Sequence, residues 1–118
     1  MSVSYFVRYE GTAQDRAAFV DYYRRSHVPI LARWPRIRQI ILHQPIAWQD
    51  PFPVHPDRFC LLAQMVFDSE ADLQTALGSP ERAEAREDFA RFPAFRGSVL
   101  HQAVESEQCN VEGERDRQ

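Results

Sequence analysis

The sequence contains no lysine, because every one of its 14 basic residues is an arginine. Enzymes that form a Schiff base through a lysine, and proteins that bind nucleotides with a P-loop lysine, are therefore excluded as functional classes. Cysteine is also scarce: Cys60 and Cys109 are far apart, and neither lies at metal-ligand spacing from a histidine. We expect no metal site and no cofactor attachment motif, and reduced thiols as in a cytoplasmic protein.

An excess of positive charge is missing as well. The net charge is −3, and residues 105–118 contain five acids and two arginines, so residues 1–104 contain twelve of each. Proteins that bind nucleic acids concentrate basic charge in the binding domain, and this chain does not. No apolar run approaches the roughly 20 residues of a membrane span, and residues 1–10 lack the features of a secretory signal. We therefore predict a cytoplasmic protein without a nucleic-acid or membrane partner.

Residue patterns predict one α+β domain over residues 1–104, followed by an acidic polar tail over residues 105–118. β-branched and aromatic runs indicate strands, spacings of three and four indicate helices, and proline-rich residues 49–57 indicate a loop. The predicted order is a strand over 3–10, a helix from Ala13 to about His27, strands over 37–47 and 58–67, helical pieces after Ser69 and Ser79, and a strand over 98–104. This β-α-β-β-α-β order is typical of a ferredoxin-like fold with a four-stranded antiparallel sheet and helices on one face.

The strand predicted over residues 58–67 is apolar on both of its faces. Phe59, Leu61 and Met65 point to one side, whereas Leu62 and Val66 point to the other. Helices can cover only one side of a two-layer domain, and monomers rarely expose large apolar patches. We therefore expect a homodimer in which two sheets face each other and enclose a cavity.

Several stretches together resemble the EthD family of dimeric α/β-barrel proteins. The likeness extends over about residues 3–104, although no one stretch is specific to the family. The stretches are an aromatic pair at 22–23, the H-V-P sequence at 27–29, Trp34-Pro35, and the helical region 67–92 with its aspartate Asp88 and the following aromatic residues.

The resemblance implies a dimeric barrel and a loose functional class. The family is named after a protein encoded with a monooxygenase system for ether degradation, and related barrels include cofactor-free enzymes such as muconolactone isomerases and dehydratases. In the muconolactone methylisomerase, a histidine matching His27 lies in the active site, which makes His27 the candidate catalytic residue here. The active-site cysteine of that enzyme is replaced by Met65, so its particular reaction is not carried over. Arg36 stands where relatives commonly have glycine.

His27 also has a case of its own from physical chemistry. Pro29 has no amide hydrogen and disfavours helical geometry at Val28, so the regular helix is predicted to end near His27 or to continue as a kinked turn. In that last turn the helix dipole favours the imidazolium of His27, whereas burial favours the neutral ring. These opposed effects predict a histidine that titrates near neutral pH and suits general acid-base catalysis. The structural alternative is a hydrogen bond from His27 to a carbonyl beside Pro29, which would only fix the kink.

Five further residues are candidates for substrate binding, and each has a structural alternative. Arg8 could bind a substrate carboxylate or form an ion pair across the dimer. Gln64 could orient a substrate or bond its dimer mate, and His43 could face the cavity or be a half-exposed strand residue. Tyr23 and Trp34 could contact a ligand or only pack.

These observations predict a cofactor-free enzyme of isomerase, dehydratase or lyase type that acts on a small apolar, ring-containing metabolite in a catabolic pathway. The alternative is a non-catalytic metabolite-binding or accessory protein of a degradation system that contains a monooxygenase. A haem-degrading barrel of similar shape is a third possibility.

Overall fold

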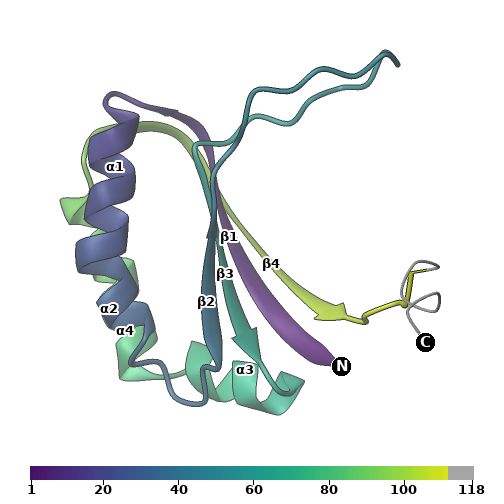
Figure 1. Cartoon of the computed structure of the whole chain (residues 1–118). Helices are drawn as coiled ribbons and strands as arrows, with labels where there is room; N and C mark the ends of the chain where they lie inside the picture. The colour runs from purple at the N-terminus through teal and green to yellow at the C-terminus, as the bar shows by residue number, and fades with distance from the viewer. Residues whose placement is uncertain (112–118) are drawn as a thin grey trace.

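Four strands form one antiparallel sheet in the order β2-β3-β1-β4 in the computed structural model, which describes residues 1–111 (Figure 1). The helices cover one face of this sheet, and the opposite face is bare within the described chain. This arrangement confirms the predicted α+β, ferredoxin-like fold. The strands are β1 (Ser2–Ala13), β2 (Gln39–His43), β3 (Leu61–Phe67) and β4 (Phe95–Ser106).

The two long strands β1 and β4 extend beyond their predicted ends. Twelve residue pairs hold them together, from Ser2 opposite Ser106 to Ala13 opposite Phe95. Gly11 was expected to end β1, but it lies directly opposite Gly97. Both glycines have positive φ, and a Cβ on either would clash with the backbone of the other strand. The glycine pair therefore lets the strands approach and continue, where larger residues would part them. β4 also enters the predicted tail, whose residues 112–118 lie outside the described chain.

The first helical region is interrupted at the place that Pro29 predicts. Asp15 caps α1 (Arg16–Tyr22), since its Oδ1 accepts a hydrogen bond from the Ala18 amide at 3.0 Å. A π-helical turn, η1 (Tyr23–His27), follows, and α2 (Val28–Leu31) resumes the helix. Proline has no amide hydrogen to donate, so the backbone widens before it, and the Val28 amide bonds to the Tyr23 carbonyl five residues earlier. His27 therefore lies at the distorted turn.

The turn after α2 contains Arg36, which has a φ of 68°. This left-handed conformation strains residues that carry a Cβ and favours glycine. It gives a physical reason for the glycine that the family resemblance led us to expect at this position.

The second helical region begins twice, as the serine positions predict. Ser69 caps α3 (Glu70–Leu77), and Ser79 caps α4 (Pro80–Asp88), each by accepting an amide hydrogen bond from the residue three positions later. A 3-10 turn, η2 (Phe89–Arg91), leads to β4. α4 therefore lies beside α2 in the helical layer.

The core lies between this helical layer and one face of the sheet. On β3, Leu61, Met65 and Phe67 are fully buried, whereas Leu62 and Val66 on the opposite face are only partly buried. The bare face of the sheet continues across β4, where Leu100 is 41% exposed. The predicted two-sided apolar character of β3 is thus present, and only one side is covered by this chain.

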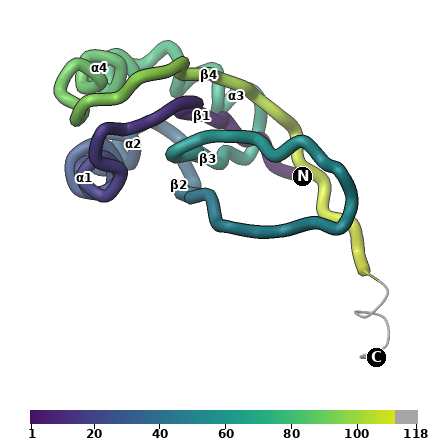
Figure 2. Tube along the Cα trace, turned by 90° about the horizontal axis from the view of Figure 1, so that it is seen from above, coloured from purple at the N-terminus to yellow at the C-terminus, as the bar shows by residue number. Residues whose placement is uncertain are grey.

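Residues 44–60 connect β2 to β3 as a long segment that projects away from the sheet and the helices (Figures 1 and 2). β2 and β3 are correspondingly shorter than predicted. Four large apolar side chains on this segment are exposed: Ile46, Trp48, Phe52 and Val54. Among the described residues, no helix has the length and apolar character needed to cross a bilayer.

Candidate functional site

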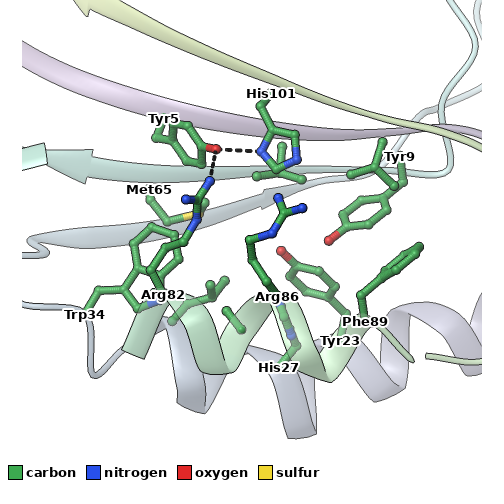
Figure 3. A pocket seen from close by; sticks show the side chains of 14 residues that line it. Tyr5, Tyr9, Tyr23, His27, Trp34, Met65, Arg82, Arg86, Phe89 and His101 are labelled. Atoms are coloured by element: carbon green, nitrogen blue, oxygen red, sulfur yellow. Dashed lines mark hydrogen bonds between the residues drawn. The ribbon is translucent and has the colours of Figure 1, made fainter. Parts of the chain in front are cut away.

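A cavity of about 230 Å³ lies between the helical layer and the covered face of the sheet (Figure 3). The sheet contributes side chains from β1, β3 and β4, and the opposite wall comes from η1, α2, α4 and the adjacent turns. Its lining is mainly aromatic, with several polar groups: Tyr5, Val7, Tyr9, Tyr23, His27, Leu31, Trp34, Met65, Arg82, Ala85, Arg86, Phe89, Val99 and His101.

A buried histidine-aspartate pair lies in the helical wall of this cavity. His27 Nδ1 lies 2.9 Å from Asp88 Oδ2, and each residue is 5% exposed. The other carboxylate oxygen accepts a hydrogen bond of 2.8 Å from the Tyr22 hydroxyl and lies 3.5 Å from the Arg91 guanidinium. An ionised carboxylate accepts hydrogen bonds, so Nδ1 of His27 carries the proton and Nε2 carries the lone pair. Asp88 thereby fixes the tautomer that leaves Nε2 as a base.

Burial lowers the pKa of His27 below its ordinary value of 6.5, while the hydrogen bond and the charge of Asp88 oppose this effect. Desolvation is the larger influence, so the ring is neutral at pH 7. A neutral imidazole oriented by a carboxylate can accept a proton from a ligand and hold it as the imidazolium. The pair therefore meets one requirement of general-base catalysis, a neutral imidazole of fixed tautomer at a cavity wall.

A second polar group lies on the sheet side of the cavity. The Tyr5 hydroxyl lies 2.6 Å from His101 Nδ1 and accepts a hydrogen bond of 3.1 Å from Arg82 Nη2 (Figure 3). Arginine can only donate, so the Tyr5 hydroxyl accepts from Arg82 and keeps its own hydrogen, which it can donate to Nδ1 of a neutral His101. Burial and the nearby charges of Arg86 and Arg82 lower the pKa of His101, which agrees with a neutral, accepting ring.

Two phenols occupy the middle of the cavity. The hydroxyls of Tyr9 and Tyr23 point toward each other (Figure 3), and burial raises the pKa of both far above the ordinary value. Both are therefore neutral at physiological pH and can offer a hydrogen bond without carrying charge. The ring centroids of Tyr23 and His27 are 4.7 Å apart, so the Tyr23 ring packs against the imidazole at the cavity wall.

The six residues predicted to form the site lie on opposite sides of the sheet. His27, Tyr23 and Trp34 line the cavity under the helices. The other three, Arg8, His43 and Gln64, lie on the bare face. A single chain therefore does not bring all six together, and the cavity next to His27 is formed within the chain instead of between two facing sheets.

The residues on the bare face satisfy one another. His43 Nε2 lies 2.9 Å from Gln64 Oε1, and Gln64 donates a hydrogen bond of 3.0 Å to the Ser4 hydroxyl. Arg8 forms ion pairs with Asp57 and, at 3.5 Å, with Glu10. The ion-pair alternative for Arg8 is thus the one seen, but within the chain. Within residues 1–111, no three potential metal-ligand side chains gather at one place.

The comparisons with known proteins bear on this fold and its helical wall. The family model described as the EthD domain matches residues 12–95, which include both His27 and Asp88. The chain belongs to the EthD family. A relative from Rhodococcus erythropolis, called an uncharacterized 11.0 kDa protein in the thcB-thcC intergenic region, is 32% identical over 86 residues, or 73% of this chain and 80% of the relative.

Solved structures extend this likeness to the whole EthD fold. An EthD family protein from Bacillus halodurans superimposes with a TM-score of 0.71 at 21% identity, over 91% of this chain and all of the other. A Bacteroides fragilis protein described as dimeric and ferredoxin-like gives 0.60 at 15% identity, over 89% and 96%. SnoaB from Streptomyces nogalater, a cofactor-independent oxygenase, gives 0.60 at 17% identity, over 94% and 98%. At these identities the likeness establishes the shared fold.

Sequence reasoning noted Asp88 only as part of the EthD resemblance and did not single out Arg82 and Arg86 on α4. A signal was available for Asp88, because it lies three positions after Ala85 and therefore on the same, buried side of α4. The spacing of Arg82 and Arg86 likewise places both on one face of α4. No sequence signal pairs Tyr5 with His101, because their meeting depends on the β1–β4 register.

Proposed function

We propose that this EthD protein is a cofactor-free enzyme that performs acid-base chemistry on a small, apolar, ring-containing metabolite bound in the cavity. The observation that carries the proposal is the buried His27–Asp88 pair, which leaves Nε2 of His27 as a neutral base in an aromatic cavity. The cofactor-free oxygenase of the same fold supports this class of chemistry by analogy alone.

The proposed reaction begins when His27 Nε2 takes a proton from a carbon next to a ligand carbonyl. The electron pair of the broken C–H bond moves into the ring system and places negative charge on the carbonyl oxygen. Neutral donors such as Tyr9 and Tyr23 can then stabilise that oxygen. The imidazolium returns the proton to another carbon in an isomerisation, or to a departing hydroxyl group, which leaves as water, in a dehydration.

We also propose that the protein acts as a homodimer in the cytoplasm. The partly exposed apolar side chains on the bare sheet face support a second copy as its cover, as do the dimeric proteins of the same fold. In that dimer each protomer keeps its own cavity under the helices. A catabolic role fits an apolar pocket for a ring compound.

The experiment compares His27→Ala with His55→Ala as a matched control, because His55 is exposed on the segment between β2 and β3 and does not line the cavity. The purified protein is incubated with candidate ring metabolites in D₂O, and mass spectrometry measures product formation and deuterium incorporation. We expect His27→Ala to lower the rate by about 100-fold or more, the usual contribution of a general base, and His55→Ala to leave it unchanged. Undiminished turnover in His27→Ala would refute the catalytic role.

The same experiment distinguishes the alternative function, a metabolite-binding or accessory protein. That function needs the aromatic cavity but not the base. A ligand that binds the wild-type protein, is released chemically unchanged and takes up no deuterium would favour the accessory protein over the enzyme.

A further inference from the structure

We infer that the cavity recognises a ring compound bearing a carboxylate, which Arg86 binds at the α4 side with Arg82 beside it. This inference rests on the proposed function, since it names the class of ligand for the same cavity. It moves the predicted carboxylate contact from Arg8, which the structure pairs with acids on the other face, to two arginines that no sequence argument had singled out.

Charge is the first observation that supports the inference. Arg82 and Arg86 both line the cavity, one helical turn apart on α4. Among residues 1–111 no aspartate or glutamate lines it, and the nearby carboxylate of Asp88 is paired with His27. Within residues 1–111, neither guanidinium forms an ion pair, whereas the α4 residue Glu84 pairs with Arg33 at 2.9 Å outside the cavity. Two adjacent like charges repel each other, and a bound anion would relieve that repulsion. The cavity is therefore electrostatically complementary to an anion.

The orientation of the two side chains distinguishes their roles. In Figure 3 the guanidinium of Arg86 points from α4 toward the sheet and His101, across the cavity, while Arg82 donates to the Tyr5 hydroxyl at 3.1 Å. Arg82 thus has one of its donors engaged. Arg86 is an exposed residue whose guanidinium has no hydrogen-bond or ion-pair partner within residues 1–111, so all of its donors are open to a ligand. A planar guanidinium matches a carboxylate through two parallel hydrogen bonds.

An unsatisfied donor in the wall is consistent with a ligand that brings oxygen atoms. Trp34 is a buried residue that lines the cavity. Its indole Nε1 has no hydrogen-bond partner within residues 1–111. Buried donors in folded proteins nearly always have a partner. A ring ligand with an oxygen substituent besides its carboxylate could provide the missing acceptor.

The size and lining of the cavity define the rest of the ligand. An apolar cavity of about 150 Å³ accepts one benzene molecule, so about 230 Å³ suits one or two fused rings with small substituents. Tyr9, Tyr23 and Phe89 supply aromatic faces for such rings. A bicyclic aromatic carboxylate is therefore a suitable probe.

The test is isothermal titration calorimetry with 2-naphthoate and its neutral isostere 2-naphthamide, and with 2-naphthol as a phenolic probe. The variants are Arg86→Gln, Arg86→Lys and Arg82→Gln, and Arg24→Gln is the control, because it makes the same change at an exposed arginine on η1 that does not line the cavity. Thermal melts confirm that each variant is folded. His27→Ala is titrated as well, to separate binding from the proposed base.

We expect the wild-type protein to bind 2-naphthoate at least about tenfold more tightly than 2-naphthamide, the difference that one hydrogen bond to a charged group provides. Arg86→Gln should remove most of this preference without changing the affinity for the amide, and Arg86→Lys should restore part of it. Arg82→Gln should weaken carboxylate binding less, and Arg24→Gln should leave it unchanged.

Any of four results would overturn the inference. The wild-type protein could bind 2-naphthoate and 2-naphthamide with equal affinity, bind 2-naphthol more tightly than 2-naphthoate, or bind no probe at millimolar concentration. The fourth result is a preference for the carboxylate over the amide that survives in both Arg82→Gln and Arg86→Gln. Its failure is distinguishable from failure of the proposed function. The inference requires that His27→Ala still bind 2-naphthoate more tightly than 2-naphthamide, whereas the proposed function requires loss of turnover in that variant.

Discussion

Replacing Asp88 by asparagine tests whether this residue sets the tautomer of His27. The Oδ1 side of Asp88 faces the Tyr22 hydroxyl at 2.8 Å and the Arg91 guanidinium at 3.5 Å, and both are donors there. In Asp88→Asn the amide oxygen is therefore expected on that side, which turns the NH₂ group toward His27. Because that group can only donate, Nδ1 of His27 must become the acceptor and its proton must move to Nε2.

The expected effects differ in size for stability and for activity. Hydrogen bonds to a charged group contribute about 1 kcal/mol more than neutral ones, and the neutral amide is cheaper to bury. The two effects partly cancel, so Asp88→Asn should lower the free energy of unfolding by only about 1 kcal/mol. Turnover should fall by about 10²- to 10⁴-fold, because Nε2 no longer offers a lone pair.

The assay is ¹⁵N NMR of the His27 ring, which distinguishes the two neutral tautomers, together with thermal denaturation and turnover. Asp21→Asn is the matched control, because Asp21 is an exposed acid that pairs with Arg25 on the outer side of the first helical region. The control should change neither the tautomer nor the turnover. A proton that stays on Nδ1 of His27 in Asp88→Asn, or wild-type turnover in that variant, would refute the positioning role of Asp88.

Two further predictions concern pH and assembly. Burial lowers the pKa of His27 and of His101 in the folded protein. Between these folded pKa values and 6.5 the unfolded chain binds more protons than the folded protein, so the free energy of unfolding must fall as the pH drops through that window. The melting temperature should therefore decrease from pH 7 to pH 5, and less steeply in His27→Gln; an identical slope in this variant would contradict the assignment. For the dimer, Leu100→Arg places a charge on the bare face and should give single subunits in sedimentation velocity at micromolar concentration, with Ala83→Arg on the outer side of α4 as a control that stays dimeric. A folded monomer of the wild-type protein under these conditions would show that the homodimer proposal is wrong.

The local rules of helix capping and chain breaking were readable without the tertiary structure. Ser69 and Ser79 begin their helices as expected, and Pro29 marks the π-helical turn that ends at His27. These features depend on a residue and its near neighbours along the chain, so a single sequence is enough to predict them. The long β1–β4 ladder could not be predicted in the same way, because the strand continues past Gly11 only when Gly97 lies opposite.

The amino-acid sequence alone determined the order of the elements, the ferredoxin-like fold and the two-sided apolar character of β3. The tertiary structure decided which polar groups meet: it joined His27 to Asp88 and Tyr5 to His101, and it separated His43 and Gln64 from them by the thickness of the sheet. The physical reason is that periodicity shows which way a side chain points from its own element, whereas its partner is chosen by strand register and helix packing between segments far apart in the chain.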